Sequence, residues 1–191
     1  MFPPMRETRH IPLGYAVIRP NRDRAVCKVT KAIVVLLLLV SVALMLTVTV
    51  GGWSKLQGLE PVNLGWCVLY VIIAVYVAQW RRGLLPIAAG LAILLLIISL
   101  IAATGISGTS WFDRSSPGFG PADTLFGDKG LSPTALGLAT VLIAPVQALL
   151  IFFAMQGFTQ GWNVELEVPI EEAERRRRST GGPPPAQPAA A

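Results

Sequence analysis

The sequence has little charge for its length, a single histidine and only two cysteines. Charged residues make up 14% of the 191 residues, against about 25% in a typical soluble domain. A lone histidine, His10, excludes haem held by two histidines of this chain and any site built from several histidines. Cys27 and Cys67 fall in opposite leaflets of the topology derived below, so no disulfide framework is expected. With 53% hydrophobic residues, the composition predicts an integral membrane protein.

Four long apolar runs dominate the chain, and none of them contains a charged residue or a histidine. An uncharged run of about 20 residues spans the hydrocarbon layer of a bilayer as a helix, and residues 32–50 are the clearest case. The predicted fold class is all-α, a polytopic membrane protein whose domain 32–157 forms an up-and-down antiparallel bundle. Because the turn at 81–83 is very short, the middle two spans are expected to form a tight hairpin. The four predicted transmembrane helices cover about 32–51, 62–80, 84–104 and 133–157.

Three polar segments lie outside these spans. Residues 1–31 form a basic N-tail, residues 105–132 a long loop, and residues 158–191 a C-tail. In the C-tail, glutamates stand four residues before arginines, which predicts a short charged helix. The proline- and alanine-rich end, 179–191, is predicted to be disordered. No cleavage site follows the first span, so we expect it to be retained as a signal anchor.

Lysine and arginine are distributed unequally between the two sides of the predicted spans. Thirteen lie in the N-tail, the 81–82 turn and the C-tail, whereas three lie in the other two loops. Positively charged segments stay in the cytoplasm, so both termini are expected there. Twelve arginines against four lysines suggest a bacterial source. We therefore expect a multi-pass protein of the bacterial plasma (inner) membrane, with anionic lipid headgroups against its basic tails and no nucleic-acid partner.

A few uncharged polar residues lie inside the spans. Ser41, Tyr70 and Gln147 fall at a similar depth near mid-membrane, and we predict that they form an interhelical hydrogen-bond cluster. The equal alternative is that Gln147 bonds backbone groups freed by a kink at Pro145. Small residues let helices approach closely in lipid. A face of this kind on the fourth span, for packing within the bundle or against a partner, comprises Gly137, Thr140, Ala144, Gln147, Ala148 and Ala154.

Aromatic residues stand among the glycines and prolines of the 105–132 loop. Phe112, Phe119 and Phe126 recur every seven residues, and Trp111 adjoins the first of them. Loops of this length are usually functional or disordered. Two interpretations remain open: the aromatic side chains anchor the loop in the headgroup layer, or the loop forms a cap that docks on a partner subunit or a ligand.

One short stretch resembles a known family. Residues 52–56, Gly-Trp-Ser-Lys-Leu, resemble the Gly-x-x-Lys-Leu step of small four-helix DoxX-like membrane proteins. The resemblance covers these five residues, and no functional residue is carried over from it.

No catalytic constellation is visible in the sequence. The spans hold no ionisable group for a proton or ion path, and no glycine-rich phosphate loop or nucleophile elbow occurs. We therefore predict no catalytic, metal-binding or cofactor-binding residue and no cofactor. The leading hypothesis is a non-catalytic accessory or scaffold subunit of a larger membrane complex. The alternative is a carrier or sensor that binds a lipid or small molecule in a cavity between the helices. A third hypothesis is an enzyme subunit whose catalytic residues lie on a partner.

Overall fold

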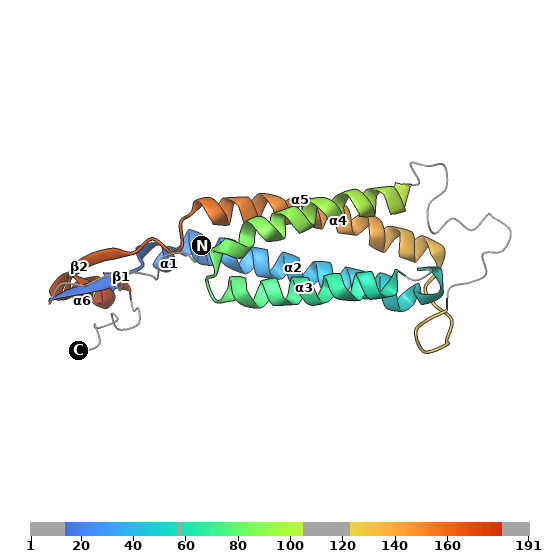
Figure 1. Cartoon of the computed structure of the whole chain (residues 1–191), viewed down its shortest axis with the longest axis horizontal. Helices are drawn as coiled ribbons and strands as arrows, with labels where there is room; N and C mark the ends of the chain where they lie inside the picture. The colour runs from blue at the N-terminus through green and yellow to red at the C-terminus, as the bar shows by residue number, and fades with distance from the viewer. Residues whose placement is uncertain (1–13, 57–58, 105–122, 181–191) are drawn as a thin grey trace, which may run out of the picture.

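The computed structural model describes residues 14–56, 59–104 and 123–180. Four long helices lie side by side and form its main body (Figure 1). Each of them is long and apolar enough to cross a membrane, which confirms the four apolar helices predicted. These helices are α2 (Ala25–Gly51), α3 (Glu60–Ala78), α4 (Leu85–Thr104) and α5 (Pro133–Thr159).

The helix ends differ from the predicted spans mainly at α2, which begins at Ala25 instead of 32. An apolar run marks only the part of a helix that lies in hydrocarbon, and Lys28 and Lys31 extend the same helix beyond it. The start of α5 follows the expected pattern, because Pro133 is its first residue and the Ser132 hydroxyl accepts a hydrogen bond from the Ala135 amide at 3.3 Å.

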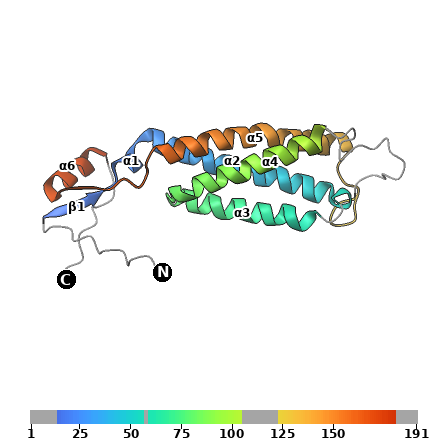
Figure 2. The same cartoon turned by 45° about the horizontal axis from the view of Figure 1, so that its top comes forward.

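The helices do not pair as the sequence suggested. Helix α4 packs chiefly against α5, and α2 packs against both α3 and α5. Although only the short 3-10 turn η2 (Arg82–Leu84) and its flanking residues join α3 to α4, these two helices make little contact. Figure 2 shows α4 leaving α3 to lie along α5. The predicted tight hairpin is therefore wrong, because fully buried small residues such as Ala88 and Ala92 let α4 approach α5 closely instead.

The interior and the outer surface of the four helices differ in the way a lipid environment requires. Leu38, Leu85 and Leu150 are fully buried in the core. Large apolar side chains also cover the outside of every long helix, and Leu36, Ile72, Ile98 and Phe152 are all 45% or more exposed. Surfaces of this kind are rare on soluble monomers and suit contact with lipid tails.

The two ends of the chain are joined beyond one end of the helices. Strand β1 (Tyr15–Ile18) pairs antiparallel with β2 (Leu166–Pro169), with Tyr15 opposite Pro169 and Ile18 opposite Leu166 (Figure 1). Helix α6 (Ile170–Thr180) packs on this two-stranded sheet and shares a small apolar core with it, formed by Ala16, Val168 and Ala173.

Neither strand was expected from the sequence, which predicted two unconnected tails. Four residues of alternation are too short to be distinguished from a polar segment, and the pairing joins positions about 150 residues apart. Helix α6 occurs where the spacing of glutamate and arginine predicted one. It continues through Thr180, although disorder was expected from 179 onward, and residues 181–191 lie outside the described part of the chain.

Candidate functional site

Three uncharged polar side chains from three different helices meet inside the bundle. The Tyr70 hydroxyl on α3 donates to Gln147 Oε1 on α5 at 2.8 Å, and Gln147 Nε2 donates to Ser41 Oγ on α2 at 2.8 Å. The Ser41 hydroxyl in turn donates to the carbonyl oxygen of Leu37 at 2.7 Å. All three side chains are fully buried. The structure thus brings Ser41, Tyr70 and Gln147 together into one polar chain, a name we keep for these three residues.

The direction of the polar chain follows from what each group can donate. The single hydroxyl proton of Ser41 goes to the backbone, which leaves its oxygen free to accept from the amide of Gln147. The amide oxygen accepts the phenolic proton of Tyr70. The amide of Gln147 therefore bonds these two side chains and not the backbone near Pro145. These groups are neutral, so the polar chain joins α2, α3 and α5 without placing a charge in the membrane.

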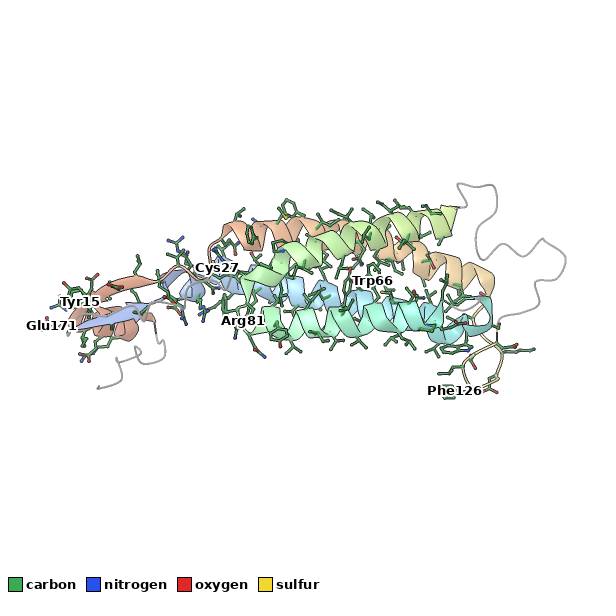
Figure 3. The ribbon with its side chains drawn as sticks, in the orientation of Figure 1. Tyr15, Cys27, Trp66, Arg81, Phe126 and Glu171 are labelled. Carbon is green, nitrogen blue, oxygen red and sulfur yellow. The ribbon has the colours of Figure 1, made fainter. Side chains whose placement is uncertain are left out.

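The indole N–H of Trp66 lies buried beside the polar chain, near the Tyr70 hydroxyl, and makes no hydrogen bond of good geometry. It is the one buried side-chain nitrogen or oxygen without a partner in the residues that the structure describes. The Trp66 ring stands edge-on to the ring of Tyr70, with 6.4 Å between their centroids, and Figure 3 labels it on α3. Nothing in the sequence pattern pointed to a buried donor at this position.

The small-residue face predicted on α5 is buried in most of its length. Thr140, Ala144 and Ala154 are all 7% exposed or less, and the Thr140 hydroxyl donates to the Leu136 carbonyl one turn earlier at 2.8 Å. Ala148, in contrast, is exposed. It lies about 100° round the helix from Gln147, which takes it beyond the edge of the buried stripe.

Only part of the predicted aromatic loop is described. Trp111, Phe112 and Phe119 lie outside the described residues, whereas Phe126 occupies the tip of a short hairpin closed by a bridge between Asp123 and Lys129. The Phe126 side chain is 80% exposed. Figure 3 shows it projecting at the end of the helices opposite the sheet.

The hairpin that carries Phe126 is held firmly in place. Ser54 pairs with Asp123 through two hydrogen bonds, from the Asp123 amide to Ser54 Oγ at 2.8 Å and from the Ser54 amide to the Asp123 carbonyl at 3.4 Å. The Thr124 amide donates to the Asp128 carbonyl at 2.8 Å. Gly127 supplies the left-handed backbone conformation of the turn, with φ of 84°. The exposed tip is thus a defined feature of this end.

At the opposite end, the segment before α2 bonds the backbone carbonyls that directly follow α5. Asn21 Nδ2 donates to the carbonyl oxygens of Gln160 and Gly161 at 3.1 and 3.0 Å, and Arg22 Nε donates to that of Trp162 at 3.4 Å. Asn21 and Arg22 lie on the short helix α1 (Pro20–Asp23). The C-terminal end of a helix attracts positive charge, and this N-terminal segment therefore places Arg22 beside the end of α5 and fixes the backbone that leaves it.

The C-terminus of α3 is capped from the same side. The amides of Trp80 and Arg81 donate to the carbonyls of Val77 and Tyr76, which is the Schellman arrangement. Lys31 Nζ donates to the Ala78 carbonyl at 3.2 Å. Trp80 takes the left-handed position with φ of 66°, where glycine is usual and where a bulky residue is exceptional.

The contacts made by the Trp80 ring offer a reason for a tryptophan at this position. Lys31 Nζ lies 4.1 Å from its centroid and Arg22 Cζ lies 5.8 Å from it, within the range of cation–π attraction. The fully buried Trp162 meets it edge-on, with centroids 5.4 Å apart. Trp80 thus joins segments from the start, middle and end of the chain, and we call this set of contacts the terminal junction.

A second row of hydrogen bonds runs through the terminal junction. Trp162 Nε1 donates to Gln160 Oε1 at 3.0 Å, and Gln160 Nε2 donates to Thr30 Oγ1 at 2.9 Å. Burial and the neighbouring charge of Arg19 lower the pKa of Arg22, and Glu165 offsets part of that effect. Glu165 pairs with Arg19 at 2.6 Å. The sequence indicated only on which side of the membrane these cations lie, and it did not bring them together with the two tryptophans.

The fold and these contacts define a mostly helical protein with four helices able to cross a membrane. Within the described residues, no group of three or more histidine, cysteine, aspartate or glutamate side chains could hold a metal ion. No protein-family model, curated protein or solved structure matches this chain.

Proposed function

We propose that this protein is a non-catalytic accessory or scaffold subunit of a larger complex in the plasma membrane. One observation carries the proposal: Phe126 is 80% exposed at the tip of a hairpin that hydrogen bonds tie to Ser54. A large aromatic side chain held out from a fixed turn is typical of the anchors found at protein interfaces. The adjacent Leu125, 46% exposed, enlarges the apolar tip.

The polar chain supports a structural role for the bundle itself. The Tyr70 and Ser41 hydroxyls and both ends of the Gln147 side-chain amide bond to one another or to backbone. Because these groups are fully buried and already paired, they serve to hold the helices and leave little capacity for a reacting substrate. This arrangement favours a packed scaffold over a cavity lined by the same residues.

We further propose an up-and-down antiparallel arrangement with both termini in the cytoplasm. The pairing of β1 with β2 requires both terminal segments to lie at one end of the helices. Arg22, Lys31 and Arg82 gather at that end around Trp80 and Phe158. Positive charge marks the cytoplasmic side of a membrane protein, so the Phe126 hairpin is proposed to face outward.

Photocrosslinking in native membranes tests the docking role directly. In the variant Phe126→benzoylphenylalanine, we expect illumination to produce one crosslinked protein species of defined size. The matched control is Phe152→benzoylphenylalanine, because Phe152 is 60% exposed on the side of α5 and should react with lipid. Crosslinking of position 126 to lipid alone would reject docking and would identify the hairpin as a headgroup anchor.

A second candidate function, binding of a lipid or other small molecule within the membrane, is favoured by Trp66. Its buried indole N–H makes no hydrogen bond of good geometry, and a carbonyl or hydroxyl oxygen of a ligand would compete with the nearby Tyr70 hydroxyl to accept one. Native mass spectrometry of the protein in mild detergent tests this idea. A molecule retained by the wild type and lost from Trp66→Phe, but not from Trp53→Phe, would establish binding beside the polar chain.

A further inference from the structure

Three positively charged side chains gather at the terminal junction from separate parts of the chain. Arg22 and Lys31 approach the ring of Trp80, as described above. Arg82 comes from η2, and its guanidinium carbon lies 5.7 Å from the ring centroid of Phe158 on α5. Arg82 lies near the other two cations because Gly161 neighbours both Arg82 and Asn21. A Cβ built on Gly161 would lie 3.7 Å from Arg82 Nη1 and 3.6 Å from the Asn21 side-chain nitrogen, and Asn21 precedes Arg22.

Within the described residues, these three charges have no direct carboxylate partner, although Glu165 lies close enough to act on Arg22. Throughout residues 14–56, 59–104 and 123–180, Arg22, Lys31 and Arg82 form no ion pair with an aspartate or glutamate, and the carboxylate of Glu165 is bonded to Arg19. Burial is the main cause that lowers the pKa of Arg22, and the charge of Arg19 lowers it further by more than Glu165 raises it. The charges that act on Arg22 therefore have a net positive effect. A net positive field favours an anion in the same place.

The three cations are held in position and still have donors to offer. Arg22 uses Nε and one terminal nitrogen, on the Trp162 carbonyl and on Asn163 Oδ1 at 2.9 Å. Lys31 uses one of its three N–H groups on the Ala78 carbonyl. The guanidinium of Arg82 donates no hydrogen bond to any group in the described residues, and the residue is half-buried. A planar guanidinium with unused N–H groups is well suited to bind phosphate oxygens in pairs.

We propose that Arg22, Lys31 and Arg82 form a binding site for one phosphate group, carried by an anionic phospholipid headgroup. The site lies where the four apolar helices end, beside Trp80 and Trp162, and tryptophans of this kind mark the headgroup layer. The lipid tails would lie along the apolar outer surface of the helices. The proposal rests on the membrane location of the helices and is independent of the accessory role assigned to the opposite end.

The test uses the full chain in phosphatidylcholine nanodiscs to which phosphatidylglycerol is added. Native mass spectrometry and the thermal unfolding midpoint report binding. We expect one phosphatidylglycerol to be retained by the wild type and Arg82→Gln to weaken its retention about tenfold or more. The matched control is Arg81→Gln, which removes the same charge from an exposed neighbour and should weaken retention by about fivefold at most. Arg82→Lys, which keeps the charge, should restore part of the binding.

Three results would overturn the proposal. Equal losses in Arg82→Gln and Arg81→Gln would mean diffuse attraction to the membrane surface without a built site. Equal retention of phosphatidylglycerol and phosphatidylcholine by the wild type would remove the requirement for an anion, and this comparison needs no variant to fold. Stabilisation by millimolar inorganic phosphate that abolishes retention of phosphatidylglycerol would assign the site to free phosphate. None of these outcomes changes the crosslinking expected at Phe126, so the two proposals fail separately.

Discussion

The polar chain and the terminal junction both hold the helices together, but they do so with different kinds of interaction. Both join helices that are distant in sequence, and both depend on fully buried side chains such as Gln147 and Trp162. In the polar chain every member is neutral and bonds directly to another side chain or to backbone. In the terminal junction, Lys31 bonds the last carbonyl of α3, Arg22 bonds a carbonyl just beyond α5, and both lie against the ring of Trp80.

The difference follows from the solvent that each region meets. In the middle of the membrane, a charged side chain costs several kcal/mol, and no water is present to bond an unpaired polar group. Hydrogen bonds between neutral side chains are therefore favoured there. At the helix ends, water and headgroups lower that cost, and long cationic side chains can reach the membrane surface while their stems stay packed. The polar chain therefore sets helix register, whereas the terminal junction adds large buried aromatic area and electrostatic attraction. We expect the junction to contribute more to stability.

The largest effect is expected for Trp162→Ala. Removal of a fully buried tryptophan in a tight setting, where a Cβ on Gly157 would already meet the Trp162 ring at 3.0 Å, should cost about 3 kcal/mol or more. Thermal unfolding in mild detergent measures the loss, and hydrogen exchange at β1 and β2 should increase. The control is Trp53→Ala at a half-buried position. Equal midpoints for the two variants would remove the junction as the main stabilising region.

Features that depend on regular spacing along one helix could be predicted from the sequence. Uncharged apolar runs predicted the four long helices, and the depth of Ser41, Tyr70 and Gln147 predicted that they would meet. Depth can be read from sequence because each residue advances a helix by a fixed rise. Helix pairing could not be read in the same way. The short turn after α3 favoured a hairpin, yet burial of small residues such as Ala88 on α4 decided the partner.

The terminal junction was beyond the reach of sequence patterns for a different reason. Its contacts join residues such as Arg22 and Trp162, which are 140 positions apart, and they depend on a left-handed tryptophan at position 80. No local propensity favours tryptophan there. The strands β1 and β2 are four residues each, and an isolated pair of strands is marginally stable, so their local sequence does not predict them. Charge counting detected the same cations but could indicate only their side of the membrane.

The second prediction concerns a substitution that removes the hydrogen bonds of the polar chain. In Gln147→Leu, the Tyr70 and Ser41 side chains lose their bonds across the interior. Hydrogen bonds in membranes average about 0.6 kcal/mol each, so two of them predict a loss of about 1 kcal/mol, less than for Trp162→Ala. Gln156→Leu, on an exposed position of the same helix, is the control. A double-mutant cycle with Tyr70→Phe should show coupling, and full additivity would contradict the direct bond.

The third prediction separates backbone strain from ring contacts at Trp80. Both Trp80→Gly and Trp80→Ala remove the ring that Lys31 and Arg22 approach. Only glycine adopts the left-handed conformation of this residue without steric cost, so Trp80→Gly should remain about 1 kcal/mol more stable than Trp80→Ala. Thermal unfolding of the two variants in the same detergent gives this difference directly. An alanine variant as stable as the glycine variant would mean that position 80 is not left-handed.

The smallest effect is expected at the edge of the terminal junction, where Arg19 pairs with Glu165. Their side chains are 45% and 36% exposed, and ion pairs in contact with water contribute about 0.2–1 kcal/mol because solvent screens them. Arg19→Gln should therefore shift the unfolding midpoint only slightly, and added salt should remove the shift. Arg22→Gln is the informative contrast, because Arg22 also donates to the Trp162 carbonyl and lies over Trp80. If Arg19→Gln proved as damaging as Arg22→Gln, charge pairing at the surface would contribute as much to stability as the contacts with Trp80 and Trp162, and the expected order of effects would be wrong.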